Sequence, residues 1–254
     1  KMIETVTRYF EKVVVVLNVG GMVDTSWFVK EKKIPAVLLA WQGGMEGGLA
    51  AAELLAGMGS PSGKLPDTFA ARLEDYPSSY NFHESDFYVD YTDDIYVGYR
   101  YFETIPGALA KVNYPFGFGL SYTQFDWQVV SVSEKLGQLL VQVDLTNVGK
   151  RPGKEVLQVY GMAPQGKLGK SKRHLLVFEK SRLLQPGETQ RLRLAWKMED
   201  MASYDDLGKV KKSAYVLEQG DYFFYLGNSV ENVEKLAVCL YRHCLLYTSD
   251  AADE

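Results

Sequence analysis

The spacing of hydrophobic and polar positions changes along the chain near residue 70. Before that point, hydrophobic residues at 3, 6 and 10 fall on one face of a helix over 2–11. Two apolar runs, 13–17 and 34–40, have the length and β-branched content of buried strands. Helices are expected after each run, over 25–32, with Asp24 or Thr25 as its cap, and over 45–58. Strands that alternate with helices predict a parallel sheet with right-handed crossovers.

Residues 122–243 follow the period of two that is typical of half-buried strands. Turn signals rich in Gly, Pro and Asn separate the runs, for example at 147–149 and 186–188. The strands expected here are 139–147, 155–160, 175–179, 190–196 and 221–226. Short strands at this spacing predict an antiparallel, immunoglobulin-like sandwich of about seven strands. The fold class is therefore α/β plus all-β.

The segment 71–121 shows no clear periodicity and is dense in Tyr, Phe, Asp and Gly. Long irregular segments in compact proteins are usually functional or pack against another domain. Its candidate residues are Asp93, Asp94, Tyr99, Arg100 and Tyr101. They would either line a sugar subsite, where rings stack and carboxylates bind hydroxyls, or form an interdomain plug.

The plug is the favoured interpretation of this segment. Tyr96, Val97 and Phe102 have the character of buried anchors, and Arg100 is expected to pair with Asp94 or another acid. The basic run 167–173 and the following His174 are expected in a solvated loop.

Composition narrows the function classes. Among 254 residues, 28 are Lys or Arg and 32 are Asp or Glu, so the formal net charge is −4 and a nucleic-acid partner is not expected. No apolar run reaches the length of a membrane span. The two cysteines, Cys239 and Cys244, make no disulfide framework or metal motif. His83-Glu84 lacks the second histidine of a zinc motif, because position 87 is Phe.

Several blocks of sequence resemble glycoside hydrolase family 3, in the order found in its β-glucosidases. Further blocks resemble the fibronectin type III-like domain that follows in such enzymes, and the resemblance covers residues 1 to about 243. The first set is KVVVVLN (12–18), WQGGMEGG (41–48), SGKLP (62–66), DIYVGYRYF (94–102) and YPFGFGLSYT (114–123), and the second is KEVLQVY (154–160), LVFEK (176–180) and LQPGE (184–188).

The resemblance implies a domain plan. Residues 1–70 would be the C-terminal part of an α/β-sandwich domain, 71–121 a connecting segment, and 122–243 the fibronectin type III-like sandwich. The chain begins with Lys1 in place of an initiator Met, already inside a helical pattern, and 244–254 resembles a translated sequencing adapter. We therefore expect a fragment of a longer reading frame. The compartment is left open, with the cytoplasm favoured.

The resemblance also implies a retaining β-glycosidase acting on terminal β-D-glucosyl residues of glucosides or oligosaccharides, without a metal or organic cofactor. Its nucleophilic Asp, in a barrel domain, and its acid/base Glu would both precede Lys1, so this chain receives no catalytic residue and is expected to be inactive alone. A β-xylosidase, a catalytically inactive relative and a non-catalytic carbohydrate- or protein-binding module remain alternatives.

One further group of residues is expected near substrate. Trp41, Gln42 and Glu46 follow the second predicted strand, and crevices in α/β sheets lie at the carboxyl ends of strands. Trp41 would stack on a sugar or be structural. Glu46 would face the substrate or, as we favour, be stabilised by the helix N-terminus.

Overall fold

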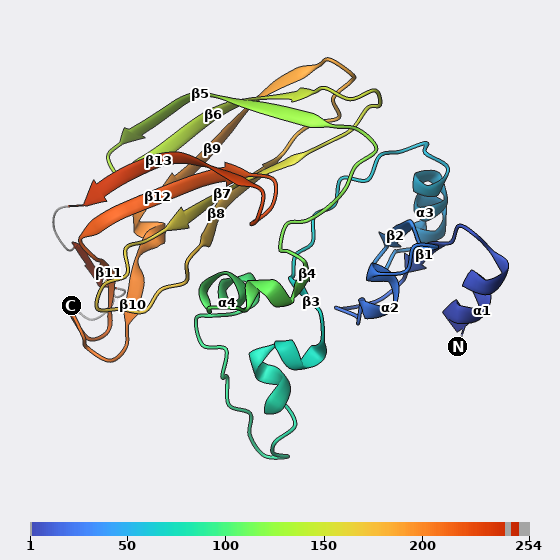
Figure 1. The fold of residues 1–254 in the computed structure, drawn as a ribbon. Coiled ribbons are helices and arrows are strands. Elements are labelled where there is room, and N and C mark those ends of the chain that lie inside the picture. The colour runs from blue at the N-terminus through green and yellow to red at the C-terminus, as the bar shows by residue number, and fades with distance from the viewer. Residues whose placement is uncertain (1, 242–244, 249–254) are drawn as a thin grey trace.

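The structure is a computed structural model that describes residues 2–241 and 245–248 (Figure 1). An α/β part, a connecting segment and a β-sandwich follow one another along the chain. The two larger parts lie on opposite sides of the connecting segment.

The α/β part contains a two-stranded parallel sheet, as the sequence predicts. Val14 pairs with Ala36 and Leu17 with Leu39. Both helices that follow the strands are shorter than expected. The elements are α1 (Met2–Tyr9), β1 (Val14–Leu17), α2 (Ser26–Val29), β2 (Ala36–Leu39) and α3 (Gly47–Leu55).

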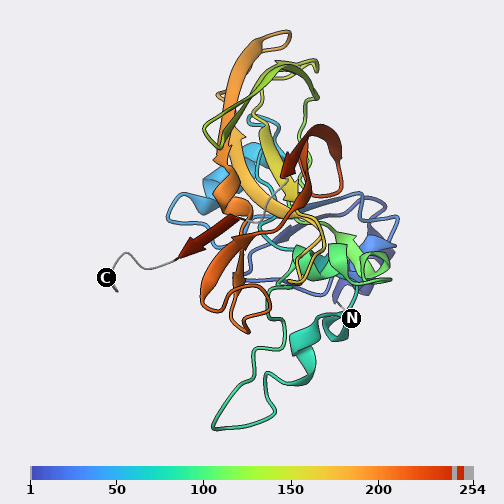
Figure 2. The same ribbon diagram turned by 90° about the vertical axis from the view of Figure 1, so that its left-hand side faces the viewer.

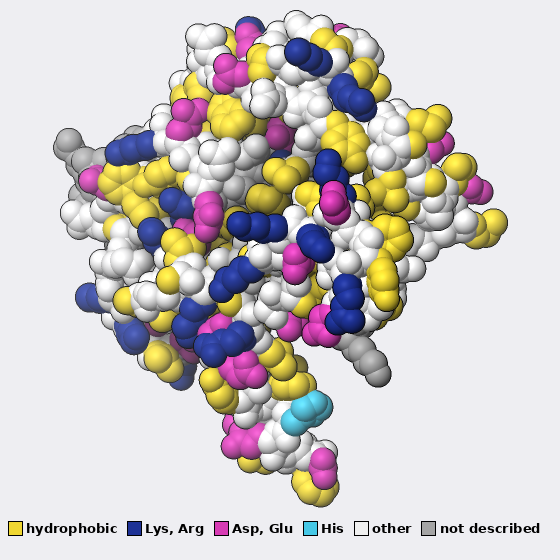
Figure 3. Space-filling model, turned by 45° about the vertical axis from the view of Figure 1, so that its right-hand side comes forward, with side chains coloured by type: hydrophobic (Ala, Val, Ile, Leu, Met, Phe, Trp, Pro, Cys, Tyr) yellow, Lys and Arg dark blue, Asp and Glu magenta, His cyan; other side chains and the backbone are white. Residues whose placement is uncertain are grey.

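The burial expected for the first strand is not found. Val14 is 52% and Val16 is 42% exposed. The reason is that only two strands form this sheet among the described residues, so one of its faces has no covering layer. Figure 3 shows hydrophobic side chains gathered over this side of the molecule. Those exposed on α3 and the residues that flank it include Met45, Leu49, Leu55 and Met58.

The sandwich packs a three-stranded sheet, β5-β6-β9, against a four-stranded sheet, β13-β12-β7-β8. The number of strands agrees with the predicted sandwich of about seven, although β5 and β13 were not among the five strands predicted by position, and the neighbouring pairs are antiparallel. Alternate residues of β6 and β9 face the core. The strands are β5 (Phe125–Lys135), β6 (Gln138–Asn147), β7 (Val156–Met162), β8 (His174–Lys180), β9 (Thr189–Lys197), β12 (Gly220–Gly227) and β13 (Val233–Tyr241).

A third, smaller sheet was not expected. It has the order β10-β11-β14, with β10 (Ser203–Asp205) after the short helix η4 (Met198–Met201), then β11 (Ala214–Leu217) and β14 (Leu245–Thr248). Residues 245–248, within the adapter-like segment 244–254, form β14 and pair with β11. Residues 244 and 249–254 lie outside the described part of the chain.

The connecting segment has its own small core, in which Ala70, Phe102 and Ala108 are buried. Between η2 and α4 the chain forms an irregular arm that projects from the rest of the molecule (Figure 2). The elements of the segment are β3 (Phe69–Ala70), η1 (Leu73–Asp75), η2 (Pro77–Tyr80), α4 (Tyr99–Thr104), η3 (Leu109–Lys111) and β4 (Val112–Tyr114).

Candidate functional site

The loops that follow β1 and β2 meet at the carboxyl edge of the parallel sheet. The Ala40 amide donates to Leu17 O at 2.9 Å, which aligns the ends of the two strands. Beyond it, the Gln42 side chain lies against Gly20, where an added Cβ would come within 2.9 Å of Gln42 Nε2. Trp41 has φ +54°, a left-handed conformation that is rare outside glycine. Such conformations cluster at functional sites, which fits the prediction for Trp41 and Gln42.

Glu46 is the N-terminal capping residue of α3, yet its carboxylate makes no capping hydrogen bond. It is exposed to solvent. The positive end of the helix favours a carboxylate at this position, as in the interpretation we favoured from the sequence. Trp41, Gln42 and Glu46 thus follow one strand at one open edge, and their proximity to substrate remains a prediction.

Helix α4 packs on the start of strand β8, from the sandwich. Arg100 Nη2 lies 2.7 Å from His174 Nδ1, and the Leu175 amide donates to the Tyr99 hydroxyl at 2.9 Å. His174 is half-buried. Burial and then the Arg100 guanidinium lower the pKa of its imidazole. A neutral His174 can accept the hydrogen bond that Arg100 donates.

The C-terminal turn of α4 makes a second pair of contacts with the same stretch of the sandwich. Arg173 Nη1 lies 3.1 Å from Glu103 Oε2, and the Lys172 amide donates to Thr104 Oγ1 at 2.8 Å. Burial raises the pKa of the Glu103 carboxyl, against the opposing effect of Arg173. The connecting segment is therefore fixed to the sandwich by side chains of both.

These contacts correct the expectation of a solvated basic loop. Lys170 is buried and its Nζ contacts Glu218, whose carboxylate also accepts from the Lys167 and Leu168 amides. Burial raises the pKa of the Glu218 carboxyl, but Lys170 and these amides lower it by more. The pKa of this carboxyl therefore lies below its usual range. Lys170 and Arg173 of this run pair with acids that are distant in the sequence, Glu218 and Glu103, whereas Lys167 and Lys172 are exposed.

The two candidate tyrosines pack inside the protein. Tyr99 stacks on Phe116 with ring centroids 4.6 Å apart and meets the edge of Tyr160 in the sandwich. Tyr101 contacts Phe102 edge to face at 5.2 Å. Phe102 is buried, as expected of an anchor. Both tyrosines thus act as packing residues.

The other residues of this group behave differently from expectation. Val97, expected as an anchor, is 57% exposed and lies at the end of the arm, two residues before α4 begins. Arg100 forms no ion pair with Asp94 or another acid among the described residues and is bonded to His174 instead. Asp94 is exposed, with φ +49°. Asp93 Oδ1 is buried without a hydrogen-bond partner among the described residues.

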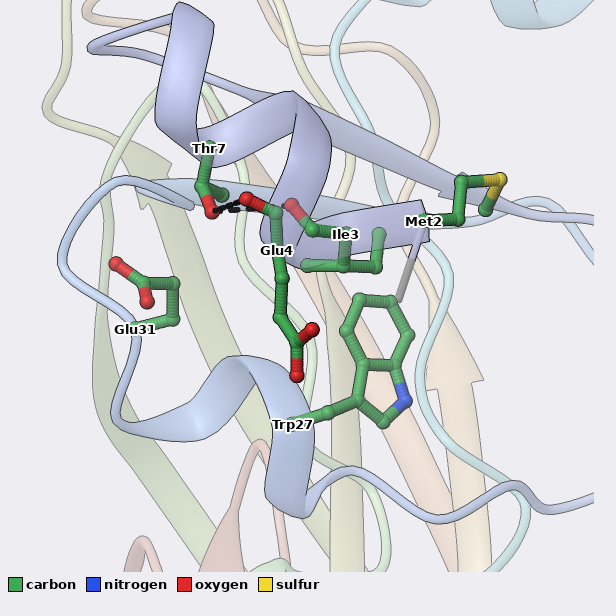
Figure 4. Close-up of a pocket in the computed structure, with 6 residues that line it drawn as sticks. All are labelled: Met2, Ile3, Glu4, Thr7, Trp27 and Glu31. Carbon is green, nitrogen blue, oxygen red and sulfur yellow. Dashed lines mark hydrogen bonds between the residues drawn. The ribbon is translucent and has the colours of Figure 1, made fainter.

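The described part of the chain contains hollows at two places that bear on function. One, of about 490 Å³, lies between α1 and α2, where the Trp27 ring lies beneath Met2 and Ile3 (Figure 4). Thr7 Oγ1 donates there to the Ile3 carbonyl within the same helix. The second, of about 510 Å³, lies between the arm and the sandwich and is lined by Asp94 and Arg100.

Two further features were searched for over residues 2–241 and 245–248. No helix there is long and apolar enough to cross a membrane. No three His, Cys, Asp or Glu residues gather there in a way that could hold a metal ion.

Comparison with known proteins accounts for both parts of the chain. Residues 1–122 match the glycosyl hydrolase family 3 C-terminal domain, and 155–230 match the fibronectin type III-like domain. The chain belongs to glycoside hydrolase family 3. It is 60% identical to beta-glucosidase A of Butyrivibrio fibrisolvens over 251 residues, covering 93% of this chain and 30% of the relative. It is 44% identical to a beta-glucosidase of Ruminococcus albus, covering 95% and 24%.

Solved structures give the same result for this family 3 chain. A beta-glucosidase from Paenibacillus barengoltzii matches with a TM-score of 0.94 at 49% identity, over 99% of this chain and 28% of that one. Beta-glucosidase 3B from Thermotoga neapolitana, solved with alpha-D-glucose, matches with a TM-score of 0.87 at 37% identity, over 97% and 34%. The chain thus spans about a third or less of these relatives.

The motif blocks that carried the family resemblance contact one another in the structure. The Leu65 amide donates to Phe118 O, and the Gly117 amide to Leu65 O, both at 2.8 Å, which joins the SGKLP block to PFGFG. Lys64 of the first block reaches Glu155 of the KEVLQVY block. The sequence analysis did not single out Lys64 or Glu155, and the one available signal was their place within these blocks.

Proposed function

We propose that this chain is the C-terminal part of a β-glycosidase that releases terminal β-D-glucosyl residues from glucosides or oligosaccharides. The observation that carries the proposal is its 60% identity to a protein named beta-glucosidase A, over nearly the whole of this chain. The bacterial sources of that relative and of the one from Ruminococcus albus favour a bacterial origin.

The catalytic pair belongs to the preceding part of the polypeptide in this proposal. A retaining glycosidase needs a nucleophilic and an acid/base carboxyl group about 5–5.5 Å apart. The acids that the sequence singled out here lie in separate segments: Glu46 is at the start of α3, while Asp93 and Asp94 lie in the arm between η2 and α4. The exposed face of β1 fits the same interpretation, because the remaining α/β layer and the barrel domain would cover it.

Trp41 and Gln42 are the residues of this chain that we place nearest to substrate. The support is the left-handed Trp41 backbone and the meeting of two loops at the carboxyl edge of the sheet. Asp93, Tyr99 and Tyr101 we assign to domain packing, with Arg100 as the residue that joins α4 to the sandwich.

The test is hydrolysis of aryl β-glucoside and aryl β-xyloside by the 254-residue chain and by the chain restored to its longer reading frame. Turnover of the glucoside by the longer protein alone is the expected result. Preference for the xyloside would replace the proposed sugar, and turnover by the short chain would contradict the placement of the carboxylates. In the longer protein, Trp41→Ala should raise KM, while Tyr122→Phe, at the domain junction, should not.

A further inference from the structure

The hollow of about 510 Å³ lies where the base of the arm meets the sandwich. Its walls come from segments far apart in the sequence: the arm with the start of α4, the β7–β8 connection, and the stretch from η4 past β10. This volume lies within the range of small-molecule sites, about 300–1,000 Å³. A hollow built at the junction of two parts is also where such sites preferentially occur.

The walls of this hollow, here called the junction pocket, carry both signs of charge. The acids that line it are Asp94, Asp200 and Asp206, and the cations are Arg100, Lys170 and Lys209. Lys170 is already bound to Glu218, so Arg100 and Lys209 are the cations available to a ligand. A ligand with a strong charge of its own would meet a like charge in this pocket. A neutral ligand whose hydroxyl groups both donate and accept can use acids and cations together.

Arg100 is the strongest polar feature of the junction pocket. A guanidinium has five N–H donors. The described residues provide one hydrogen-bond partner, His174 Nδ1, and no carboxylate at ion-pair distance. A half-buried arginine with donors to spare in a cavity is suited to bind oxygen atoms of a ligand.

Asp94, from the arm, also lines the pocket. Its φ of +49° is uncommon for a residue with a side chain, and such conformations persist where the surrounding structure fixes them and cluster at functional sites. Tyr96 and Tyr204 also line the pocket. Aromatic rings offer apolar faces to the C–H faces of a sugar ring, while carboxylates and Arg100 can bind the hydroxyls.

We propose that the junction pocket binds a neutral saccharide, with Arg100, Asp94 and Asp206 as its polar contacts. The choice of a β-linked glucose oligosaccharide as ligand rests on the proposed function, whereas the pocket and its preference for a neutral polyhydroxyl ligand do not. A sugar bound here would also bridge the arm and the sandwich.

The test is a calorimetric titration of the 254-residue chain with cellobiose, without any measurement of turnover. Binding in the millimolar range is expected. Arg100→Ala and Asp206→Asn should each weaken it about tenfold, since each removes a hydrogen bond to a charged group. Arg191→Ala, which removes an exposed arginine on β9, should bind as the unchanged protein does.

Three outcomes would overturn the proposal. These are no cellobiose binding by the unchanged chain, binding that neither pocket variant weakens, and citrate binding that depends on Arg100 in place of sugar binding. Arg100→Ala also removes the hydrogen bond to His174 and so could weaken binding by disturbing the fold. Asp206→Asn leaves that hydrogen bond in place and tests the pocket independently. Because binding is measured on its own, a longer protein that fails to hydrolyse glucosides would overturn the proposed function and leave this test intact.

Discussion

Lys64 Nζ lies 2.7 Å from Glu155 Oε1, and this ion pair joins the α/β part to the sandwich. The two side chains are only 11% and 9% exposed. Asn228 donates to the second oxygen of Glu155 at 3.1 Å, and the Val156 amide donates to the first. Lys64 and Glu155 lie in two different motif blocks of the family. These blocks therefore form a junction between two parts of the protein, in addition to any role near substrate.

Lys64→Met should destabilise the protein strongly. The substitution keeps the length of the side chain but leaves the Glu155 carboxylate buried without its cation, which costs about 3–5 kcal/mol for a typical buried pair. Urea unfolding followed by tryptophan fluorescence measures the effect. Arg191→Ala is the matched control, because its pair with Asp144 is exposed and should matter little. Equal unfolding midpoints for the two variants would contradict the role given to the junction pair.

The contact between α4 and the sandwich should weaken in acid. Burial and Arg100 lower the pKa of His174, so the unfolded chain binds a proton more readily than the folded one. Stability is therefore full above about pH 6.5, the usual imidazole value, and decreases as the pH falls below it. Asp200 opposes the shift in part. Protonation places a second cation beside Arg100 and removes the acceptor of its hydrogen bond.

Thermal unfolding between pH 7.5 and pH 5 measures this dependence, and His174→Gln should reduce it because the amide oxygen still accepts from Arg100 at every pH in this range. His83→Gln changes an exposed histidine of the arm and should leave the dependence as it is. A pH profile that is the same in both variants would exclude His174 as its source.

Asp205 should stabilise the small sheet at neutral pH. Burial raises the pKa of its carboxyl, but hydrogen bonds from four backbone amides lower it by more, so the pKa lies below the usual range. The donors are the amides of Gly208, Lys209, Val210 and Lys211. They lie 2.6–3.0 Å from the two carboxylate oxygens. A lowered carboxyl pKa means that stability is full above about pH 4 and is lost as the pH falls through the folded value.

Asp205→Asn should accordingly lower the melting temperature at pH 7 and flatten its decrease between about pH 4 and about pH 2. Asp86→Asn, in the exposed arm, is the control and should follow the unchanged protein at every pH. A variant as stable as the unchanged chain at pH 7 would show that the amide contacts add nothing to stability.

The strands that the sequence predicted are those with an unbroken period. β6 was expected over 139–147, and its inward positions, such as Val141 and Val143, are fully buried. β5 was not predicted, because its hydrophobic residues change from odd to even positions at Val129 and Val130, where the strand has a bulge, although burial keeps alternating across it. Phe178, in the predicted strand 175–179, is 62% exposed. Strand β8 also has a register shift, because Val159 of β7 pairs with Val177 while the next residue, Tyr160, pairs with Leu175.

The domain contacts were harder to predict for a different reason. Residues 167–174 resemble a solvated loop by charge alone, and their partners Glu103 and Glu218 lie about fifty residues or more away in the sequence. Charge pairing over such distances has no local signature. The packing of Phe102 could be predicted, because aromatic residues in an irregular segment usually bury against a neighbouring domain. The contact between Arg100 and His174 could not be predicted from the sequence.

The sandwich should fold without the α/β part, whereas the whole chain should self-associate through its exposed apolar face. Residues 123–241 contain both sheets and the main buried core. Large exposed apolar patches favour association, and Leu49, Leu55 and Met58 add to the exposed apolar residues of β1.

Size-exclusion chromatography with light scattering should find 123–241 monomeric and the 254-residue chain partly associated. Leu49→Glu combined with Met58→Lys should reduce that association, while the control Leu136→Glu, on the exposed β5–β6 turn, should not. Self-association of residues 123–241 alone would contradict this prediction, because it would place the associating surface on the sandwich.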